Sequence, residues 1–223
     1  MRILITRNVE KKESPLKNWC NQHHCELIFQ SFIEVEPVLN LTVPETDWVF
    51  FSSPKGAELF LSQNEIKASK IAALSIGTAE VLMNKGYQVD FIGEKGKSTL
   101  QIATAFNLQL TTKDWVLFPL SNRSVKSIQS ALPKGNKIEL ITYRTNPVKR
   151  VIPDETKVII VSSPSNGEGL KLSGLKDKTT IKLIAWGETT LNFLKREFPK
   201  HESVKMKEFT EEGILPLLSQ VLR

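Results

Sequence analysis

The chain has 223 residues, of which 40% are hydrophobic and 24% are charged, a composition typical of globular proteins. This length accommodates one large domain or two domains of about 100 residues each. No apolar run approaches the roughly 20 residues that a membrane-spanning helix needs. The first residues are charged too early for a signal peptide, and the two cysteines do not indicate a disulfide framework. We therefore expect a cytoplasmic protein with no membrane partner.

The charge balance favours an anionic partner, because 30 Lys and Arg residues stand against 24 Asp and Glu residues, for a net charge of +6. The basic residues are dispersed and form no run interleaved with aromatic residues, so we do not expect nucleic acid as the partner. Two interpretations remain open. The ligand is a small molecule with several carboxylates or phosphates, or the charge has no role in binding.

Apolar strand-like runs alternate with helix-like segments along nearly the whole chain, which is typical of parallel sheets with helices on both faces. We therefore predict an α/β fold. The expected strands are 2–6, 26–29, 32–38, 48–51, 71–74, 88–92, 115–118, 137–141, 158–161 and 181–185. The expected helices are 15–23, 55–61, 78–84, 100–106 and 123–132, one after 162–164, one after 187–190 and one at the C-terminus.

One short pattern occurs twice. An apolar run leads into Ser52-Ser53-Pro54 in the first half of the chain and into Ser162-Ser163-Pro164 in the second half. Each copy continues with a helix-like segment, a second apolar strand and a turn of small or hydroxyl-bearing residues, 75–78 in one copy and 187–190 in the other. A duplicated unit predicts two similar lobes. Ligands commonly bind in the gap between such lobes.

The position of the two copies predicts how the chain is divided. The first copy begins only after about 48 residues and the second ends near the C-terminus, so the leading segment belongs with the C-terminal half. The predicted parts are residues 1–35 with 150–223 as lobe one, residues 41–142 as lobe two, and residues 36–40 and 143–149 as connectors. Residues 32–38 alternate apolar and acidic side chains, which favours an edge strand or a connector with one solvated face.

The Ser-Ser-Pro motif suits the start of a helix at the end of a strand. Proline fits the first helical position, and the preceding serine can cap the helix. The free N–H groups and the helix dipole attract an anion, and ligands of open α/β sheets gather at the carboxyl ends of the strands. Helix capping alone is the alternative explanation. Two copies, each with a hydroxyl-rich turn, favour anion binding.

The sequence lacks the common catalytic motifs. It contains no glycine-rich nucleotide loop, no Gly-x-Ser-x-Gly and no His-Glu-x-x-His. Cys20, His23, His24 and Cys25 are close in sequence, but they fall where a helix is expected to end, and we do not predict a metal site there.

The ordered set of motifs resembles the uroporphyrinogen-III synthase family. The matching segments are Ile3–Arg7, Asp47–Gly56, Ile71–Leu74, Thr78–Leu82, Gly86–Ile92, Arg123, Tyr143–Thr145, Ser162–Ser165, Ala185–Thr190 and Thr210–Gly213. They span almost the whole chain in the family's order. Each motif alone has low specificity, and the ordered set is what carries the resemblance.

The resemblance implies two α/β lobes, with parallel sheets flanked by helices, that are joined by a two-stranded connector, and an active site between them. It implies a lyase that cyclises hydroxymethylbilane, a linear tetrapyrrole with carboxylates on every ring, with loss of water and inversion of ring D in haem biosynthesis. It implies no cofactor, and we expect a monomer acting on this small molecule. The alternative is a bilobal anion-binding protein without catalytic activity.

The resemblance also implies substrate contacts from both lobes. The residues in the corresponding positions are Arg7, Ser52, Ser53, Lys55, Ser75, Thr78, Arg123, Ser163, Ser165, Asn166, Thr189 and Thr190. The catalytic residue is unknown, with Tyr143 and Thr189 as candidates. Some family members carry a tyrosine, proposed as a proton donor, five residues beyond the second Ser-Pro-Ser, and the corresponding position here is about Gly169.

Overall fold

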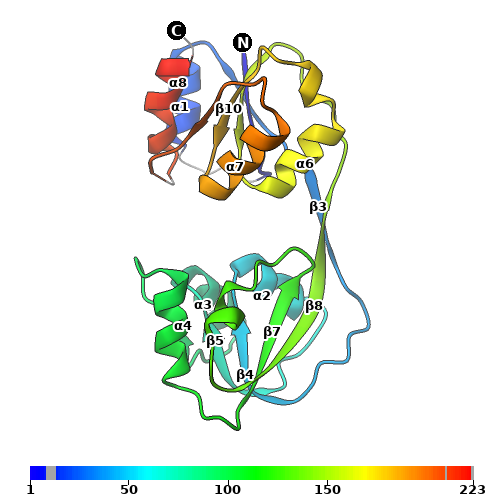
Figure 1. The fold of residues 1–223 in the computed structure, drawn as a ribbon, viewed down its shortest axis with the longest axis vertical. Helices are drawn as coiled ribbons and strands as arrows, with labels where there is room; N and C mark the ends of the chain where they lie inside the picture. The colour runs from blue at the N-terminus through cyan, green and yellow to red at the C-terminus, as the bar shows by residue number, and fades with distance from the viewer. Residues whose placement is uncertain (9–13, 209, 222–223) are drawn as a thin grey trace. The chain divides into compact units, whose positions relative to one another are not determined.

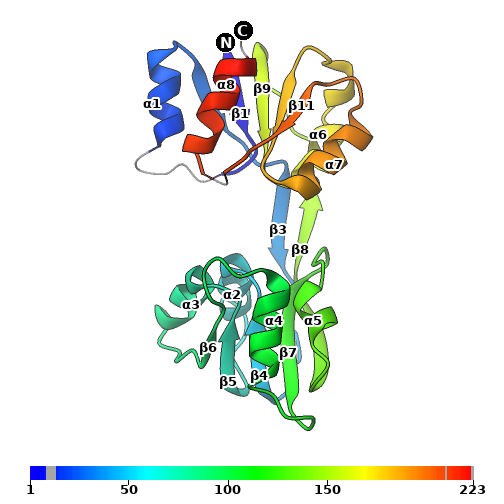
Figure 2. The same cartoon turned by 60° about the vertical axis from the view of Figure 1, so that its left-hand side comes forward.

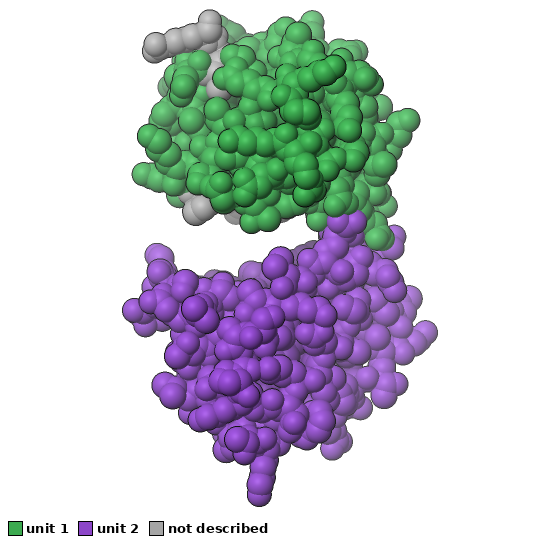
Figure 3. All heavy atoms as spheres, in the orientation of Figure 1, with its two compact units in different colours: residues 1–34, 146–223 green, residues 35–145 purple. Residues whose placement is uncertain are grey.

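The structure is a computed structural model that describes residues 1–8, 14–208 and 210–221 (Figure 1). The chain divides into two compact units, which are coloured separately in Figure 3. Unit 1 consists of residues 1–34 and 146–223, and unit 2 consists of residues 35–145. The chain passes from one unit to the other within two strands, β3 (Ile33–Pro37) and β8 (Asn136–Pro147). Within the described ranges, no helix has the length and apolar character needed to cross a membrane.

Unit 1 contains a five-stranded parallel sheet with the strand order β11-β10-β9-β1-β2. Its strands are β1 (Arg2–Ile5), β2 (Glu26–Phe29), β9 (Thr156–Val161), β10 (Lys182–Ala185) and β11 (Ser203–Lys205). Its helices are α1 (Pro15–Gln22), α6 (Pro164–Leu172), α7 (Glu188–Glu197) and α8 (Leu215–Val221), with 3-10 turns at Leu175–Asp177 and Glu212–Ile214.

Helices cover both faces of this sheet. Successive strand residues point to opposite faces, so Leu4 and Ile159 join the core cluster that includes residues of α6 and α7. Ile3 and Ile160 join the cluster that includes residues of α1 and α8. Figures 1 and 2 show α1 and α8 as neighbours on one face. Burial of both faces explains why these strands are continuous apolar runs in the sequence.

Unit 2 contains a six-stranded sheet with the order β3-β8-β7-β4-β5-β6. The remaining strands are β4 (Thr46–Phe51), β5 (Ala68–Ala73), β6 (Phe91–Ile92) and β7 (Trp115–Ser121). The helices are α2 (Pro54–Leu61), α3 (Ile76–Met83), α4 (Thr99–Asn107) and α5 (Ser127–Ala131). Strands β4 to β8 are parallel to one another. Strand β3 lies at the edge beside β8 and runs in the opposite direction (Figure 2).

The core of unit 2 is divided by its sheet in the same way. Trp48 and Phe50 belong to the cluster with residues of α4 and α5. Val49 and Phe51 belong to the cluster with residues of α2 and α3. The ring of Phe50 lies 4.9 Å from that of Phe106 on α4, a contact distance for aromatic pairs. The central strand β4 is therefore anchored on both faces, and the Ser-Ser-Pro motif follows it directly.

The predicted α/β fold is confirmed, and the differences from the expected elements are local. One strand of 12 residues, β8, includes both the strand expected at 137–141 and the polar segment after it. The polar segment is extended because the neighbouring strand β3 provides hydrogen-bond partners for its backbone. The helix expected at 123–132 is shorter, Ser127–Ala131, since Ser121 and Ser124 form a hydrogen-bonded turn before it. The strand expected at 88–92 is reduced to β6, and β11 was not expected from the sequence.

Candidate functional site

Most of the predicted site residues follow the carboxyl ends of strands. Because the strands are parallel, their carboxyl ends meet at one edge of each sheet, which we call the carboxyl edge. In unit 2, the carboxyl edge carries the segments after β4, β5 and β7, which contain Ser52, Ser75 and Arg123. In unit 1, it carries the segments after β1, β9 and β10, which contain Arg7, Ser163 and Thr189.

The first Ser-Ser-Pro motif forms the start of α2. Ser53 is the N-cap residue, its Oγ accepts a hydrogen bond from the Gly56 N–H at 3.0 Å, and Pro54 occupies the first turn. The Ser53 hydroxyl hydrogen remains able to donate to an anion. The partly buried Ser52 hydroxyl has no hydrogen-bond partner within the described part of the chain. The predicted capping geometry is confirmed here, and one serine remains available beside it.

The second turn of unit 2 is built from Ser75 and Thr78. Ser75 caps α3, and its Oγ lies 3.4 Å from the Thr78 N–H and 3.1 Å from the Thr78 Oγ1. Ser75 is exposed, but Thr78 is completely buried. The expectation that both hydroxyls face a ligand therefore needs a correction: the buried Thr78 hydroxyl is hydrogen-bonded to Ser75 and holds that side chain in place. We call Ser52, Ser53 and Ser75, with the first turns of α2 and α3, the unit 2 cradle.

Two cationic side chains border the unit 2 cradle. Lys55 is exposed in the first turn of α2 and forms an ion pair with Glu58 at 3.2 Å. Exposed pairs of this kind contribute little free energy, so the ammonium group exchanges easily to another carboxylate. Arg123 is also exposed, and its Nε donates to the Thr145 carbonyl oxygen of β8 at 3.0 Å. That bond orients the guanidinium of Arg123 along the end of β8.

Tyr143, which the sequence placed in a connector, lies on β8 and against the start of α2. A Cβ atom built on Gly56 would lie 3.5 Å from Cε1 and 3.7 Å from the hydroxyl oxygen of Tyr143. The same point lies 2.9 Å from the Ser53 Oγ. The absence of a side chain at Gly56 thus lets the phenol and the capping serine approach the same helix turn. The hydroxyl of Tyr143 borders the unit 2 cradle.

The second Ser-Ser-Pro motif repeats the capped helix start in unit 1. Ser163 caps α6, with its Oγ 3.3 Å from the Asn166 N–H. The Ser165 hydroxyl is partly buried and has no hydrogen-bond partner among the described residues. The neighbouring α7 begins after Gly187, which provides no side-chain cap, so its first N–H groups are open to a ligand. Thr189 is exposed at this start. Ser163, Ser165 and Thr189, with the first turns of α6 and α7, form the unit 1 cradle.

Asn166 and Thr190 are buried and do not face solvent, which corrects the expectation for both. The Asn166 Oδ1 accepts a hydrogen bond from the Phe32 N–H at 2.7 Å. Its Nδ2 donates to the Oγ atoms of Ser162 and Ser163, each at 3.2 Å. The amide is therefore occupied in joining α6 to the segment that leads into β3. Asn166 therefore stabilises the unit 1 cradle through buried hydrogen bonds and does not bind a ligand itself.

Sequence reasoning missed a hydroxyl pair that joins β1 to β9. The Ser162 N–H donates to the Thr6 Oγ1 at 2.9 Å, and the Ser162 Oγ donates to the Thr6 carbonyl oxygen at 2.8 Å. Thr6 is 1% exposed. The available signal was that each residue directly follows a buried strand, but the sequence does not show that β1 and β9 are neighbours. This pair fixes the carboxyl edge beneath the unit 1 cradle.

Charged residues also lie on the carboxyl edge of unit 1. Arg7 follows β1 and pairs with Glu211. Glu188, in the first turn of α7, pairs with Lys205 of β11. The hydrogen bond and the positive charge of Lys205 hold the pKa of the Glu188 carboxyl below its usual value. Lys205 thus offsets the one carboxylate that would repel an anion at the start of α7.

The cysteine and histidine residues near the end of α1 have structural surroundings. The His23 ring stacks on the Trp19 ring at 3.9 Å, and Cys20 and Cys25 are buried in the core. Burial raises the pKa of the Cys20 thiol to about 12, which disfavours the reactive thiolate. Over residues 1–8, 14–208 and 210–221, no group of three or more His, Cys, Asp and Glu side chains is arranged to hold a metal ion.

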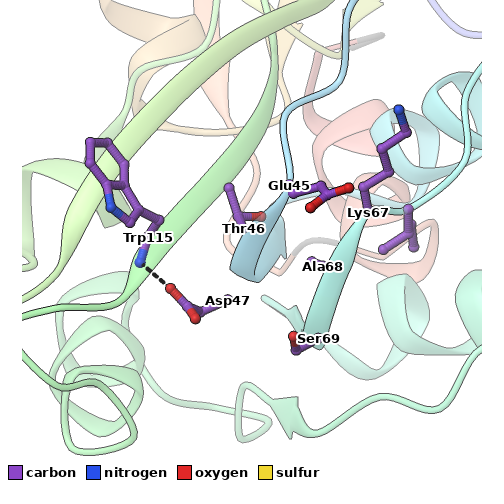
Figure 4. A pocket seen from close by; sticks show the side chains of 8 residues that line it. Glu45, Thr46, Asp47, Lys67, Ala68, Ser69 and Trp115 are labelled. Carbon is purple, nitrogen blue, oxygen red and sulfur yellow. Dashed lines mark hydrogen bonds between the residues drawn. The ribbon is translucent and has the colours of Figure 1, made fainter.

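Two open hollows in unit 2 are lined by residues outside the cradle. Figure 4 shows a pocket of about 580 Å³ at the amino ends of β4 and β5. In this pocket the backbone N–H of Trp115 donates a hydrogen bond to the Asp47 Oδ2 at 2.8 Å. The pocket is lined by Glu45, Thr46, Asp47, Ile66, Lys67, Ala68, Ser69 and Trp115. A second, more apolar hollow of about 670 Å³ lies between β6 and α4. Neither hollow contains a predicted site residue.

Comparison with known proteins identifies one matching family and several similar solved structures. The family described as uroporphyrinogen-III synthase HemD matches residues 14–220. The crystal structure of uroporphyrinogen-III synthetase from Helicobacter pylori is similar, with a TM-score of 0.67, 18% identity and complete coverage of both chains. A mutant uroporphyrinogen III synthase from Thermus thermophilus has a TM-score of 0.52 and 15% identity, over 99% of this chain and 98% of the other. A comparison with curated proteins gave no match.

Proposed function

The chain belongs to the uroporphyrinogen-III synthase family, and from this premise we propose that it cyclises hydroxymethylbilane, with loss of water and inversion of ring D, in haem biosynthesis. The observation that carries the proposal is that each unit has a pair of helix starts with hydroxyl groups at its carboxyl edge. Such helix starts favour carboxylates through free N–H groups and the helix dipole. The substrate has carboxylates on every ring, so both cradles have groups to bind.

We propose that each cradle binds carboxylates of the substrate. In unit 2, the proposed contacts are Ser52, Ser53, Lys55, Ser75 and Arg123. In unit 1, they are Arg7, Ser163, Ser165 and Thr189. Thr78, Asn166 and Thr190 are proposed as supports, since their side chains are buried. The neutral donors favour carboxylates without adding charge, and the cations at the rim attract the substrate.

The proposed chemistry starts at the hydroxymethyl group on ring A. Its C–O bond breaks, water leaves with one added proton, and a cationic methylene remains. Ring D attacks through its substituted carbon to give a spiro intermediate, which fragments and recloses with ring D inverted, and a proton is released. Since the linear substrate also closes without the enzyme, the protein must favour one geometry. Fixing the reacting carbons in this way is worth up to several kcal/mol in well-oriented systems.

Replacing Lys55 or Thr189 with alanine is expected to lower the share of inverted product by about threefold to tenfold, the effect of losing one hydrogen bond that contributes about 1 kcal/mol net. Both side chains are exposed, so the melting temperature should barely change. Chromatographic separation of the oxidised product isomers measures the share. Lys67→Ala is the matched control, because Lys67 lies at the amino edge of the unit 2 sheet and lines the pocket away from the cradle; it should leave the share unchanged. Unchanged shares in Lys55→Ala and Thr189→Ala would remove both residues from the site.

Tyr143→Phe is expected to lower kcat by less than about tenfold, because we do not expect the Tyr143 hydroxyl to be a proton donor that the reaction requires. A required and well-positioned donor would contribute more than about tenfold. The phenyl ring of the variant would remain against Gly56, so the cap of α2 should persist. Single-turnover rates with fresh hydroxymethylbilane measure the effect. A loss of a thousandfold or more would instead identify Tyr143 as the acid that protonates the leaving hydroxyl group.

The proposed function itself is tested by incubating the purified protein with hydroxymethylbilane. An excess of the inverted isomer over the mixture formed in buffer is expected. A protein that binds the product but leaves the isomer mixture unchanged would fit the alternative of a non-catalytic anion-binding protein. We also propose that the chain acts as a monomer in the cytoplasm and binds no nucleic acid. Steep, salt-dependent binding to DNA or RNA would contradict that proposal.

A further inference from the structure

Unit 1 contains a carboxylate buried beside its carboxyl edge. The Glu211 side chain is 1% exposed, although glutamate is almost never fully buried unless it is paired. Its Oε2 accepts a hydrogen bond from the Ser14 hydroxyl at 2.6 Å, and its Oε1 accepts one from the Arg7 Nη2. Glu211 is separated by 197 positions from Ser14 and by 204 positions from Arg7. The chain therefore assembles this network only when unit 1 is folded.

The guanidinium of Arg7 is held on several sides. Its central carbon lies 5.7 Å from the ring centre of Phe29 and 5.4 Å from that of Trp186, within the range of cation–π contacts. Phe29 ends β2, and Trp186 directly follows β10. The Arg7 side chain nevertheless remains 22% exposed. Two aromatic rings and Glu211 thus fix the orientation of a guanidinium that still has an open side.

Stability alone does not explain this arrangement. Buried ion pairs are often replaced by apolar residues without loss of stability, because desolvation offsets their attraction. The Arg7 Nε is in addition buried without a hydrogen-bond partner in the described part of the chain. A guanidinium has five N–H donors, and the contact with Glu211 uses one of them. The other N–H groups of the Arg7 guanidinium do not contact Glu211, and those on its exposed side are available to a ligand.

We propose that Glu211 is a positioning residue, which holds the Arg7 guanidinium at the carboxyl edge of unit 1 so that its open side binds one carboxylate of the substrate. The inference rests on the proposed function and deepens it. Arginine suits this role because its planar fork matches a carboxylate and stacks on aromatic faces, whereas lysine does neither. Glu211 acts through Arg7 and does not touch the substrate.

Glu211→Gln tests the proposal, because it preserves the size and one acceptor oxygen of the side chain but removes its charge. The excess of the inverted isomer is expected to fall about fivefold, the difference between a hydrogen bond to a charged group and a neutral one. The matched control is Glu26→Gln, which breaks the exposed Arg2–Glu26 pair (2.7 Å) at the opposite end of β1. The control should leave the isomer excess unchanged.

The coupling between Glu211 and Arg7 separates positioning from a structural role. Arg7→Lys keeps the positive charge beside Glu211 and should also lower the isomer excess, which provides the test if Glu211→Gln does not fold. In the Arg7→Lys background, Glu211→Gln should have no further effect on the isomer excess. Two results would overturn the inference. One is that Glu211→Gln lowers the melting temperature but leaves the isomer excess unchanged. The other is that Glu211→Gln lowers the isomer excess by the same factor in the wild-type and in the Arg7→Lys protein. A wild-type protein with no isomer excess would instead overturn the proposed function.

Discussion

Gly169→Ala is expected to destabilise unit 1 by about 2 kcal/mol or more, the upper range for forcing extra atoms into a packed site. A Cβ atom at this position would lie 2.1 Å from the Phe32 carbonyl oxygen and 2.6 Å from the Phe32 Cβ. Backbone cannot move aside as a flexible side chain does. In an unconstrained helix the same substitution stabilises by roughly 0.5–1 kcal/mol, so the predicted sign is the opposite of the helix propensity effect.

Urea unfolding followed by the fluorescence of Trp19 and Trp186, which lie in unit 1, measures this change. Trp48→Phe and Trp115→Phe remove the signal of unit 2. Gly77→Ala in α3 of unit 2 is the control, because its Cβ would meet nothing closer than the Pro54 Cγ at 3.9 Å. It is measured by the fluorescence of Trp48 and Trp115, with Trp19→Phe and Trp186→Phe in place. That variant should be neutral or slightly stabilised. Equal stability of Gly169→Ala and the wild type would show that α6 shifts away from Phe32 at little cost.

The close approach at Gly169 also bears on the proton donor. Some family members carry a tyrosine at about this position, and the sequence already indicated that the donor is missing here. The structure adds a physical reason, because position 169 faces the Phe32 backbone and has no room for a side chain. A donor from this position of α6 is therefore excluded for this chain. Of the candidates that remain, Tyr143 borders the unit 2 cradle and Thr189 belongs to the unit 1 cradle.

Asn166→Ala is the second substitution with a large expected effect, a loss of about 2–4 kcal/mol. It leaves the buried Phe32 N–H without its 2.7 Å acceptor, and an unsatisfied buried donor costs about 1–3 kcal/mol. It also removes the donors to Ser162 and Ser163. The same unfolding measurement applies. Asn166→Asp, which keeps the acceptor for Phe32, should lose less.

Asn18→Ala provides the reference for this second prediction. Asn18 is exposed on α1, so its replacement should change the stability by less than about 0.5 kcal/mol. If Asn166→Ala is no more destabilised than Asn18→Ala, the network from α6 to Phe32 is not a significant support. The unit 1 cradle would then depend on the Thr6–Ser162 pair alone.

Local features of the fold could be predicted from the sequence. Ser53 and Ser163 were expected to cap helices that begin with proline, and both do. The information for a cap lies within about four residues, since the serine oxygen bonds the N–H of its own helix turn. Apolar runs likewise indicated the buried strands, because strands covered on both faces are continuously apolar.

Contacts between distant segments could not be predicted in this way. Nothing in the sequence shows that β1 lies between β9 and β2, so the Thr6–Ser162 pair was missed. Arg7 and Glu211 are separated by 204 positions, and only folding brings them together. For the same reason the residue type did not distinguish exposed donors from buried supports. Ser75 and Thr78 bear similar hydroxyls, but only Ser75 is exposed.

The most direct test of the account is a titration of the isotope-labelled protein with the cyclic tetrapyrrole product, kept reduced, followed by backbone amide chemical shifts. We predict that the amides of Gly56 and Ser75 in unit 2 and of Ser165 and Thr189 in unit 1 shift together and saturate at one product molecule per chain. Shifts confined to one unit, or centred on Asp47 and Lys67 at the amino edge, would contradict the claim that both cradles bind the substrate.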